Sequence, residues 1–271
     1  MMKNPIGIVQ GRLLPPVNGA IQAFPSDNWK DEFLIASKLG FDMIELIFDG
    51  QNNPLFKTGQ AKMVVDLVSE HNLEISSVST DFSMYHPLFG DDGDESLITI
   101  CKLIDICGKV GIDRVGLSFE DNSALLSKKD VKEAIINTKK CCDIASRFDM
   151  VITIETSLHP NNIIEFIDLV DYDNLKVNFD LGNSVSCGED PALSILHLNK
   201  YIGGVHIKDR THLFGTTVPL GEGDVNFLNC FKSISEIGFK GPLVIQGARG
   251  YDDVNTAKRY MEFVKKTMDL I

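Results

Sequence analysis

Residues 39–47 read Leu-Gly-Phe-Asp-Met-Ile-Glu-Leu-Ile, a glycine that suits the end of a helix followed by an apolar run typical of a strand. Residues 110–118 and 237–245 repeat this order of a glycine, an apolar residue and a second apolar run. A helix-to-strand transition that recurs along a chain is typical of repeated β-then-α units. We therefore expect a parallel sheet covered by helices.

Short β-branched runs alternate with amphipathic stretches along the whole chain. Strands are expected at residues 6–10, 43–47, 75–80, 114–118, 151–155, 177–180, 203–207 and 243–246. Helices are expected at residues 29–38, 59–70, 95–110, 129–147, 162–169, 193–198, 226–237 and 253–268. Eight units of about 34 residues suit one barrel, and no Pro-, Gly- or Ser-rich linker divides the chain. The predicted fold class is α/β, a single (β/α)8 TIM barrel forming one domain over residues 1–271.

An open doubly wound sheet is the competing architecture. The first predicted βα turn, residues 10–16, reads Gln-Gly-Arg-Leu-Leu-Pro-Pro. It has neither the G-x-G-x-x-G fingerprint nor the P-loop pattern. Dinucleotide and ATP chemistry therefore lack their usual sequence evidence.

Composition and charge restrict the function further. Hydrophobic residues make up 44% of the chain and charged residues 24%, which is enough apolar material for a substantial core. The 26 Lys and Arg are outnumbered by 38 Asp and Glu, so the formal net charge is −12. Nucleic acids and anionic membrane surfaces attract clustered Lys and Arg, so neither is an expected partner.

The amino-terminal residues and the cysteines indicate where the protein works. The first residues lack the apolar core and small-residue cleavage site of a secretory signal, and no apolar run is long enough to span a bilayer. The six cysteines show no C-x-x-C pairing, which favours reduced thiols. We expect a cytoplasmic protein.

Four consecutive predicted strands end in polar donors, namely Glu155, Asp180, His206 and Gln246. Each donor follows an apolar residue in an alternating pattern, which directs the four side chains toward the barrel axis at its catalytic face. Two carboxylates, an imidazole and an amide oxygen form a mixed site that suits Mn²⁺, Mg²⁺, Co²⁺ or Zn²⁺. The alternative is four separately hydrogen-bonded strand ends, but unpaired acids so close together would be costly.

Several motifs follow one another in a characteristic order. They are residues 40–46 (Gly-Phe-Asp-Met-Ile-Glu-Leu), 154–155 (Ile-Glu), 179–183 (Phe-Asp-Leu-Gly-Asn), 205–209 (Val-His-Ile-Lys-Asp) and 219–227 (Pro-Leu-Gly-Glu-Gly-Asp-Val-Asn-Phe). In this order the chain resembles the xylose isomerase-like TIM barrel proteins of the sugar isomerase and epimerase group, whose relatives include endonuclease IV. The resemblance implies a divalent metal, often Mn²⁺, held by Glu, Asp, His and Glu at the ends of strands five to eight. The first three correspond to Glu155, Asp180 and His206.

The fourth position departs from this pattern, because Gln246 stands where the resemblance implies Glu. In the epimerases of the family the two glutamates flank the substrate and exchange a proton with the carbon next to its carbonyl. An amide oxygen can bind a metal but cannot accept a proton from carbon. Two-base epimerisation therefore lacks one of its bases, and Glu155 is the expected acid/base residue.

One residue of the second predicted strand and one in the loop after the third are candidates for binding substrate. Glu45 could hold a substrate hydroxyl or pair with a neighbouring base, and an acid bonded to a loop amide is the alternative. His86 lies in the loop after the third strand, where a neutral imidazole could hydrogen-bond sugar oxygens. An ordinary surface histidine is the alternative there.

Two cations after the last strands are further candidates. Lys208 shares the inward face of its strand with the metal-site histidine and could neutralise an enolate or a phosphate. A salt bridge to Glu222 or Asp209 is the alternative. Arg249, in the loop after the eighth strand, could bind a phosphate, or it could be a solvated loop charge.

The leading hypothesis is a metal-dependent isomerase or epimerase of a sugar or sugar phosphate, in which Glu155 moves a proton through an enediolate. The alternatives are a lyase or dehydratase of the same superfamily and a sugar-binding protein that lost catalysis with Gln246. An endonuclease IV-like phosphodiesterase fits poorly, since the six histidines are too few at strand ends for a multi-zinc site and the net charge repels DNA. The expected partner is a small sugar, and a homodimer is left open.

Overall fold

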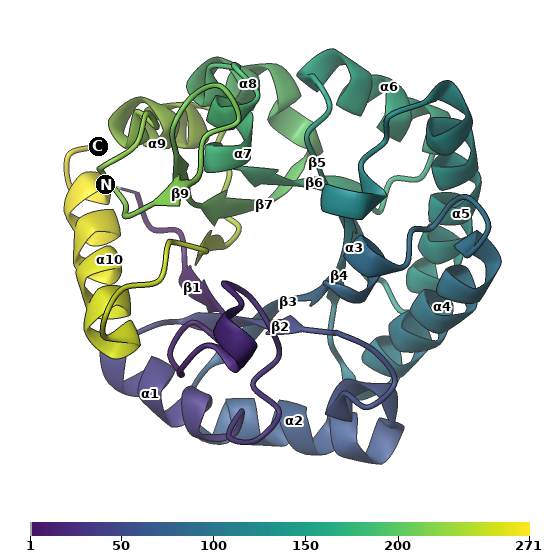
Figure 1. Ribbon diagram of the computed structural model, residues 1–271, viewed down its shortest axis with the longest axis horizontal. Helices are drawn as coiled ribbons and strands as arrows, with labels where there is room; N and C mark the ends of the chain where they lie inside the picture. The colour runs from purple at the N-terminus through teal and green to yellow at the C-terminus, as the bar shows by residue number, and fades with distance from the viewer. Residues whose placement is uncertain (1) are drawn as a thin grey trace.

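A closed barrel of parallel strands ringed by helices makes up the molecule (Figure 1). The computed structural model describes residues 2–271. Around the barrel the strands follow the order β1-β10-β7-β6-β5-β4-β3-β2. Their bounds are β1 Ile6–Val9, β2 Met43–Ile47, β3 Glu74–Thr80, β4 Arg114–Phe119, β5 Val151–Thr156, β6 Leu175–Asp180, β7 Ile202–Ile207 and β10 Leu243–Ile245. The predicted (β/α)8 barrel is confirmed, with strand bounds shifted by at most two residues.

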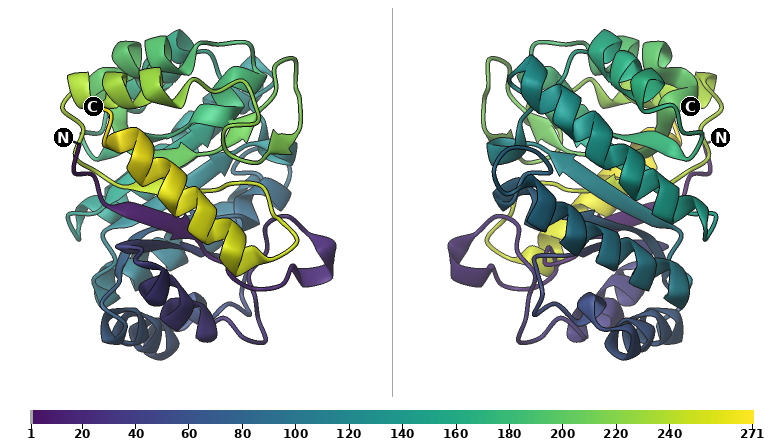
Figure 2. Two further views of the ribbon diagram at one scale, coloured as in Figure 1. Left: turned by 90° about the vertical axis from the view of Figure 1, so that its left-hand side faces the viewer. Right: turned by 90° about the vertical axis from the view of Figure 1, so that its right-hand side faces the viewer.

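Helices cover the outside of the barrel and run obliquely across its strands (Figure 2). Those that match the predicted helices are α1 Asp31–Leu39, α2 Thr58–Glu70, α4 Gly93–Val110, α5 Lys128–Ser146, α6 Pro160–Val170, α8 Pro191–Leu198, α9 Phe227–Glu236 and α10 Asp253–Met268. The prediction missed the short helices α3 Phe82–Tyr85 and α7 Leu181–Ser186, which follow β3 and β6 directly. None of the helices within residues 2–271 combines the length and the apolarity needed to cross a membrane.

The helix-to-strand transitions work as the repeated motif predicts. Gly40 ends α1 with a left-handed φ of 80°, and its N–H bonds the carbonyl groups of Ala36 and Ser37. Gly111 ends α4 in the same way with a φ of 84°. Glycine adopts this conformation without the steric cost that a Cβ would impose, so the chain can turn sharply into the next strand.

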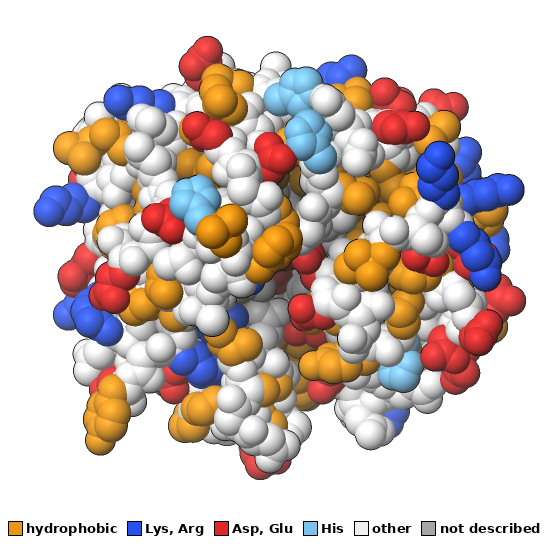
Figure 3. Space-filling model, turned by 45° about the horizontal axis from the view of Figure 1, so that its top comes forward, with side chains coloured by type: hydrophobic (Ala, Val, Ile, Leu, Met, Phe, Trp, Pro, Cys, Tyr) orange, Lys and Arg blue, Asp and Glu red, His pale blue; other side chains and the backbone are white. Residues whose placement is uncertain are grey.

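The carboxyl ends of the strands and the loops that follow them face the viewer in Figure 1. After β7 the chain forms a small antiparallel hairpin of β8 (Asp209–Arg210) and β9 (Thr217–Val218) over this face. Asp209 accepts backbone N–H bonds from Gly221, Gly223 and Val225, which holds the loop after the hairpin. A hollow opens between these loops, and acidic side chains border it (Figure 3).

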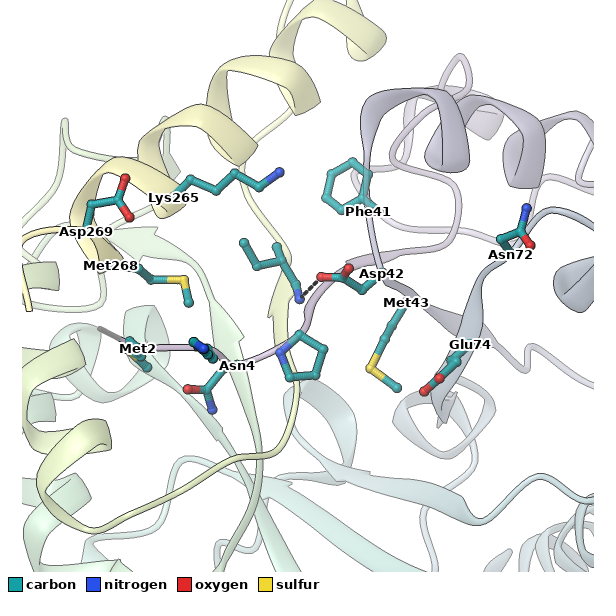
Figure 4. Close-up of a pocket in the computed structure, with 13 residues that line it drawn as sticks. Met2, Asn4, Phe41, Asp42, Met43, Asn72, Glu74, Lys265, Met268 and Asp269 are labelled. Atoms are coloured by element: carbon teal, nitrogen blue, oxygen red, sulfur yellow. Dashed lines mark hydrogen bonds between the residues drawn. The ribbon is translucent and has the colours of Figure 1, made fainter.

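The opposite end of the barrel carries a separate cavity of about 630 Å³. Its walls come from the residues that precede the first strands and from α10, and include Asp42, Glu74 and Lys265 (Figure 4). Asp42 accepts a hydrogen bond of 2.9 Å from the backbone N–H of Ile6, which ties the starts of two neighbouring strands together. Side chains at this end of a (β/α)8 barrel stabilise the fold, and the catalytic groups lie at the other end.

Candidate active site

Three of the four predicted metal ligands meet at the carboxyl ends of their strands. Glu155 lies on β5, Asp180 ends β6, and His206 lies on β7 directly opposite Asp180 in the strand register. One ligand atom from each of the three residues can be chosen such that all lie within 4.8 Å of one another. Gln246 directly follows β10, and its backbone N–H bonds the carbonyl of Ile207 and so continues the sheet. The closed barrel thus brings residues from far apart in the chain to one point.

A cavity of about 270 Å³ lies above this point. Its lining includes Glu155 and Gln246 from the predicted ligand set, and Lys208 from the predicted substrate residues. Asp180 and His206 are buried beneath it, with exposures of 5% and 1%. A small polar ligand in this cavity would therefore touch Glu155 directly.

His206 stands between carboxylates on both sides of its ring. Nε2 lies 2.8 Å from Oε1 of Glu45, and Nδ1 lies 3.2 Å from Oε2 of Glu155. Asn178, two residues before Asp180 on the same face of β6, also contacts Nε2 at 2.9 Å. Because Nε2 is engaged by Glu45, Nδ1 is the nitrogen that faces the other ligands, as in a carboxylate–histidine–metal arrangement.

The charges of Glu45, Glu155 and His206 shift the pKa values of both His206 and Glu45. Burial alone would lower the pKa of His206, but the carboxylates of Glu45 and Glu155 raise it well above its ordinary value. Burial alone would raise the pKa of Glu45, but His206 and a hydrogen bond from Ser77 hold it below its ordinary value. His206 is therefore an imidazolium when only protons compete for it, and a divalent cation would take the place of the proton on Nδ1.

Asp180 joins the metal group to the neighbouring loop. Its Oδ1 accepts the backbone N–H of Asn183 at 2.7 Å and caps the short helix α7. The Nζ of Lys208 lies 2.9 Å from Oδ2. Lys208 thus pairs with Asp180 across the strands rather than with Glu222 or Asp209, because positions 206 and 208 share the inward face of β7.

A chain of amides connects Gln246 to a further acid. Its Nε2 donates to Oε1 of Gln22 at 2.9 Å, and Gln22 in turn donates from Nε2 to Oδ2 of Asp81 at 2.9 Å. Arg12 also donates to Oε1 of Gln22, at 3.1 Å. Burial raises the pKa of Asp81 to about 6, although its hydrogen bonds with Gln22 and Ser79 lower it. The loop between β1 and α1 therefore forms one wall of the cavity and orients the amide of Gln246.

The ligand group has an unsatisfied atom that suits a cation. Within residues 2–271, Oε1 of Gln246 is buried with no hydrogen-bond partner, while Oδ2 of Asp180 and Nδ1 of His206 have only the ion-pair neighbours Lys208 and Glu155. Buried polar atoms almost always have such a partner, so the free Oε1 of Gln246 beside two carboxylates and an imidazole calls for a bound group. Two carboxylates, an imidazole and an amide oxygen match the ligand preferences of Mn²⁺ and Mg²⁺ and also accept Zn²⁺ or Co²⁺. The residues present fit a divalent metal.

The remaining predicted substrate residues lie away from the cavity wall. Glu45 is 3% exposed and already pairs with His206, which is the second of the two roles considered for it. His86 is exposed at the end of α3 and stacks on Phe82 with ring centroids 4.5 Å apart. A contact of these two residues with substrate stays a prediction.

Arg249 holds the loop between β1 and α1 in place. Its guanidinium donates to the carbonyl groups of Gly11, Leu14 and Ile21, and to the carboxylate of Asp253. Backbone carbonyl groups and the carboxylate of Asp253 therefore occupy the N–H groups that could otherwise bind a phosphate, which was one of the two roles considered for Arg249. Arg249 positions the loop that carries Gln22 into the site.

Sequence reasoning missed several groups that the structure brings into the site. Asn178 and Asn183 contact Glu155 at 3.4 and 3.3 Å, and Arg210 donates to Asn183 at 3.0 Å. Glu120, after β4, lines the cavity. The spacing of two residues along a strand could have found Asn178 before Asp180 and Glu120 after Ser118, since alternate residues share a face.

The xylose isomerase-like TIM barrel family model matches residues 33–267. The chain belongs to this family. A similar curated protein is the L-ribulose-5-phosphate 3-epimerase UlaE of Shigella flexneri, which is 25% identical over 231 residues covering 80% of this chain and 81% of that protein. The predicted family resemblance is confirmed.

Solved structures show the same fold over nearly the whole chain. The xylose isomerase domain protein of Planctomyces limnophilus matches with a TM-score of 0.81 and 19% identity, covering 99% of this chain and 98% of that one. A xylose isomerase-like TIM barrel protein of Mycobacterium smegmatis, solved in complex with magnesium, matches with a TM-score of 0.73 and 19% identity, covering 98% and 96%. At this identity the two structures establish the barrel and not the substrate.

Proposed function

We propose that this protein is a divalent-metal-dependent isomerase or epimerase of a sugar or sugar phosphate that acts through an enediolate. The observation that carries the proposal is the cluster of Glu155, Asp180 and His206 beneath a polar cavity at the catalytic end of the barrel. The curated relative named above, an L-ribulose-5-phosphate 3-epimerase, supports a sugar as the partner. The proposal includes Mn²⁺ as the ion and a cytoplasmic location.

Glu155 is the residue that would move the proton. It is the least buried of the three clustered ligands and lines the cavity, so its carboxylate can reach a carbon of the substrate. Asn178 and Asn183 contact its two oxygens and hold it in place. In the proposed reaction the carboxylate takes the proton from the carbon next to the carbonyl and later returns it.

Asp180 and His206, with Gln246 and Glu155, would hold the metal. A divalent ion bound there supplies positive charge that stabilises the negative oxygen of the enediolate. Lys208, whose Nζ lies 2.9 Å from Asp180, adds a further positive charge at the cavity wall. Glu45 keeps the imidazole of His206 oriented for binding.

Gln246 favours a second candidate, a lyase or dehydratase of the same superfamily. Elimination needs one base for the carbon-bound proton and one acid for the leaving hydroxyl, and it does not need a second glutamate on the eighth barrel strand. A sugar-binding role without catalysis remains the third alternative. Product analysis separates all three, because only elimination releases water from the carbon chain and only binding leaves the substrate unchanged.

The test combines metal titration with a panel of aldoses, ketoses and their phosphates in D₂O. We expect wild-type protein to bind Mn²⁺ by titration calorimetry, and Asp180→Asn to bind it more weakly. Asp173→Asn, an exposed acid before β6, removes the same charge outside the site and should bind as wild type does. Absence of metal binding, or no deuterium in any sugar of the panel, would refute the proposed function.

A further inference from the structure

Glu120 is a carboxyl group in the active-site cavity that the proposed chemistry has not used. It follows β4 and lines the cavity together with Asp81, Asp121 and Glu155. Both oxygens of Asp81 are occupied by Ser79 and Gln22, and Asp121 is exposed. The environment of Glu120 differs from those of the other acids.

One oxygen of Glu120 is held and the other is not. Ser157, which follows β5, donates its hydroxyl to Oε2 at 2.6 Å. Oε1 is buried, and none of the described residues forms a hydrogen bond with it. A buried carboxyl oxygen is rarely left without a partner, so an unsatisfied Oε1 on the wall of a ligand cavity indicates that a ligand atom completes it.

The charges around Glu120 favour its neutral form. Burial, with the negative charges of Glu155 on β5 and Asp180 on β6, raises the pKa of Glu120 to about 8, although Ser157 and the ammonium of Lys208 lower it. Burial is the largest of these causes and by itself favours the carboxylic acid form of Glu120. Because Ser157 donates to Oε2, the acid proton lies on Oε1.

We propose that Glu120 is a second acid/base residue, which exchanges a proton with a substrate oxygen while Glu155 exchanges one with carbon. The inference rests on the proposed function, because it assigns a further role within the same reaction. It also explains how the site works with Gln246, since the second proton transfer is to oxygen and needs no carbon base on β10.

Each proton that Glu155 or Glu120 gives or takes in the first half of the reaction is recovered in the second half. Glu155 takes the proton from the carbon beside the carbonyl, the C–H electron pair becomes the new C=C bond, and the carbonyl oxygen takes the proton of Glu120 to give an enediol. In the second half Glu120, now a carboxylate, removes the proton from the neighbouring hydroxyl. Glu155 then returns its proton to the former carbonyl carbon. The product is the carbonyl isomer, and both residues return to their starting states.

The strand order supports separate roles for Glu120, which exchanges a proton with oxygen, and Glu155, which exchanges one with carbon. β4 and β5 are neighbours in the barrel, with Ser118 opposite Glu155, so Glu120 lies two residues after Ser118, just beyond the end of the adjacent strand. Both carboxyl groups therefore act from one side of the cavity. An acid and a base on one side suit the transfer of protons between adjacent carbon and oxygen atoms, whereas inversion at carbon needs groups on opposite faces.

The test compares wild type, Glu120→Gln and the control Glu165→Gln, which removes an exposed glutamate from α6 on the outside of the barrel. Each metal-loaded protein is assayed with the sugars that wild type converts, for kcat, for KM and for exchange of the carbon-bound hydrogen with D₂O. We expect Glu120→Gln to lower kcat about a hundredfold or more, as the loss of a general acid does, with KM nearly unchanged. Exchange with D₂O should be slowed less than turnover, because exchange needs Glu120 in the first proton transfer only and turnover needs it in both, and the alkaline decline in the rate of wild type should be absent.

Other outcomes overturn the assignment in distinguishable ways. Wild-type kcat in Glu120→Gln means that the residue takes no part, and a higher KM alone means that it only binds a hydroxyl. Equal loss of exchange and turnover means that it acts on carbon or supports Glu155. If wild type itself neither exchanges nor converts any sugar, the proposed function is refuted, and with it this role for Glu120.

Discussion

The pairing of Glu45 with His206 makes a quantitative prediction for metal binding. Nε2 of His206 lies 2.8 Å from Oε1 of Glu45, and the two side chains are 1% and 4% exposed. Glu45→Gln keeps the shape and one acceptor but removes the charge. Hydrogen bonds to charged partners are worth about 1.5–3 kcal/mol and neutral ones about 1 kcal/mol, so the change costs roughly 0.5–2 kcal/mol. Since about 1.4 kcal/mol is a factor of ten, Mn²⁺ should bind roughly tenfold more weakly.

Titration calorimetry with Mn²⁺ measures this effect, and pH decides how clearly it appears. The raised pKa of His206 means that protons compete with the metal, and Glu45 strengthens that competition as well as the metal complex. The loss of affinity in Glu45→Gln should therefore be largest at alkaline pH and shrink as the pH falls.

Ser77→Ala is the matched control, since Ser77 donates to the other oxygen of Glu45 and leaves the carboxylate charged. It should reduce Mn²⁺ affinity less than Glu45→Gln does. If Glu45→Gln binds Mn²⁺ as tightly as wild type at alkaline pH, then Glu45 does not support the imidazole as a metal ligand, and the reasoning fails.

Three further predictions follow from the structure. Glu155→Gln should abolish both turnover and D₂O exchange without changing the thermal unfolding midpoint by more than a few degrees; residual exchange at the wild-type rate would show that another group removes the proton. Gln246→Glu should tighten Mn²⁺ binding by adding a carboxylate ligand. The variant is also assayed beside wild type for inversion at the carbon next to a ketose carbonyl. Unchanged Mn²⁺ affinity would place residue 246 outside the ligand set. Burial raises the pKa of Glu32 from 4.5 to about 7, so the folded protein keeps a proton that the unfolded chain loses, and stability should fall by about 3 kcal/mol as the pH rises through this range. Urea unfolding should show that Glu32→Gln lacks this decline.

The fold could be predicted because its signals are local and repeated. A glycine in the left-handed conformation ends α1 and α4, and the run after each of them forms a strand. The short helix α7 escaped prediction because Asp180 serves both as the end of β6 and as the cap of that helix. A six-residue helix has too little periodicity to stand out in the sequence.

The candidate site could be predicted only where a strand positions the side chain. Glu155, Asp180 and His206 lie together because the barrel closes and the strand register aligns their ends. The contact between Gln22 and Gln246 joins residues 224 positions apart through an irregular loop, whose path depends on Arg249 and Glu32. Local sequence holds no information on such a path, because tertiary contacts determine it.

Residue 246 is Gln where the family pattern has Glu. The strand order shows which side of the cavity lacks a carboxyl group as a result. β10 and β4 lie on opposite sides of the barrel, separated by β7, β6 and β5 on one side and by β1, β2 and β3 on the other. The amide of Gln246 and the carboxyl of Glu120 therefore lie on opposite sides of the cavity, with Glu155 on the strand next to Glu120. With an acid on β10, the cavity would have proton carriers on two sides, as inversion at carbon requires. With Gln246, the amides of Gln246 and Gln22 occupy the β10 side of the cavity. The two residues that exchange protons, Glu120 and Glu155, then both lie on the side of β4 and β5. In the proposed chemistry, protons then leave and return on one face of the substrate.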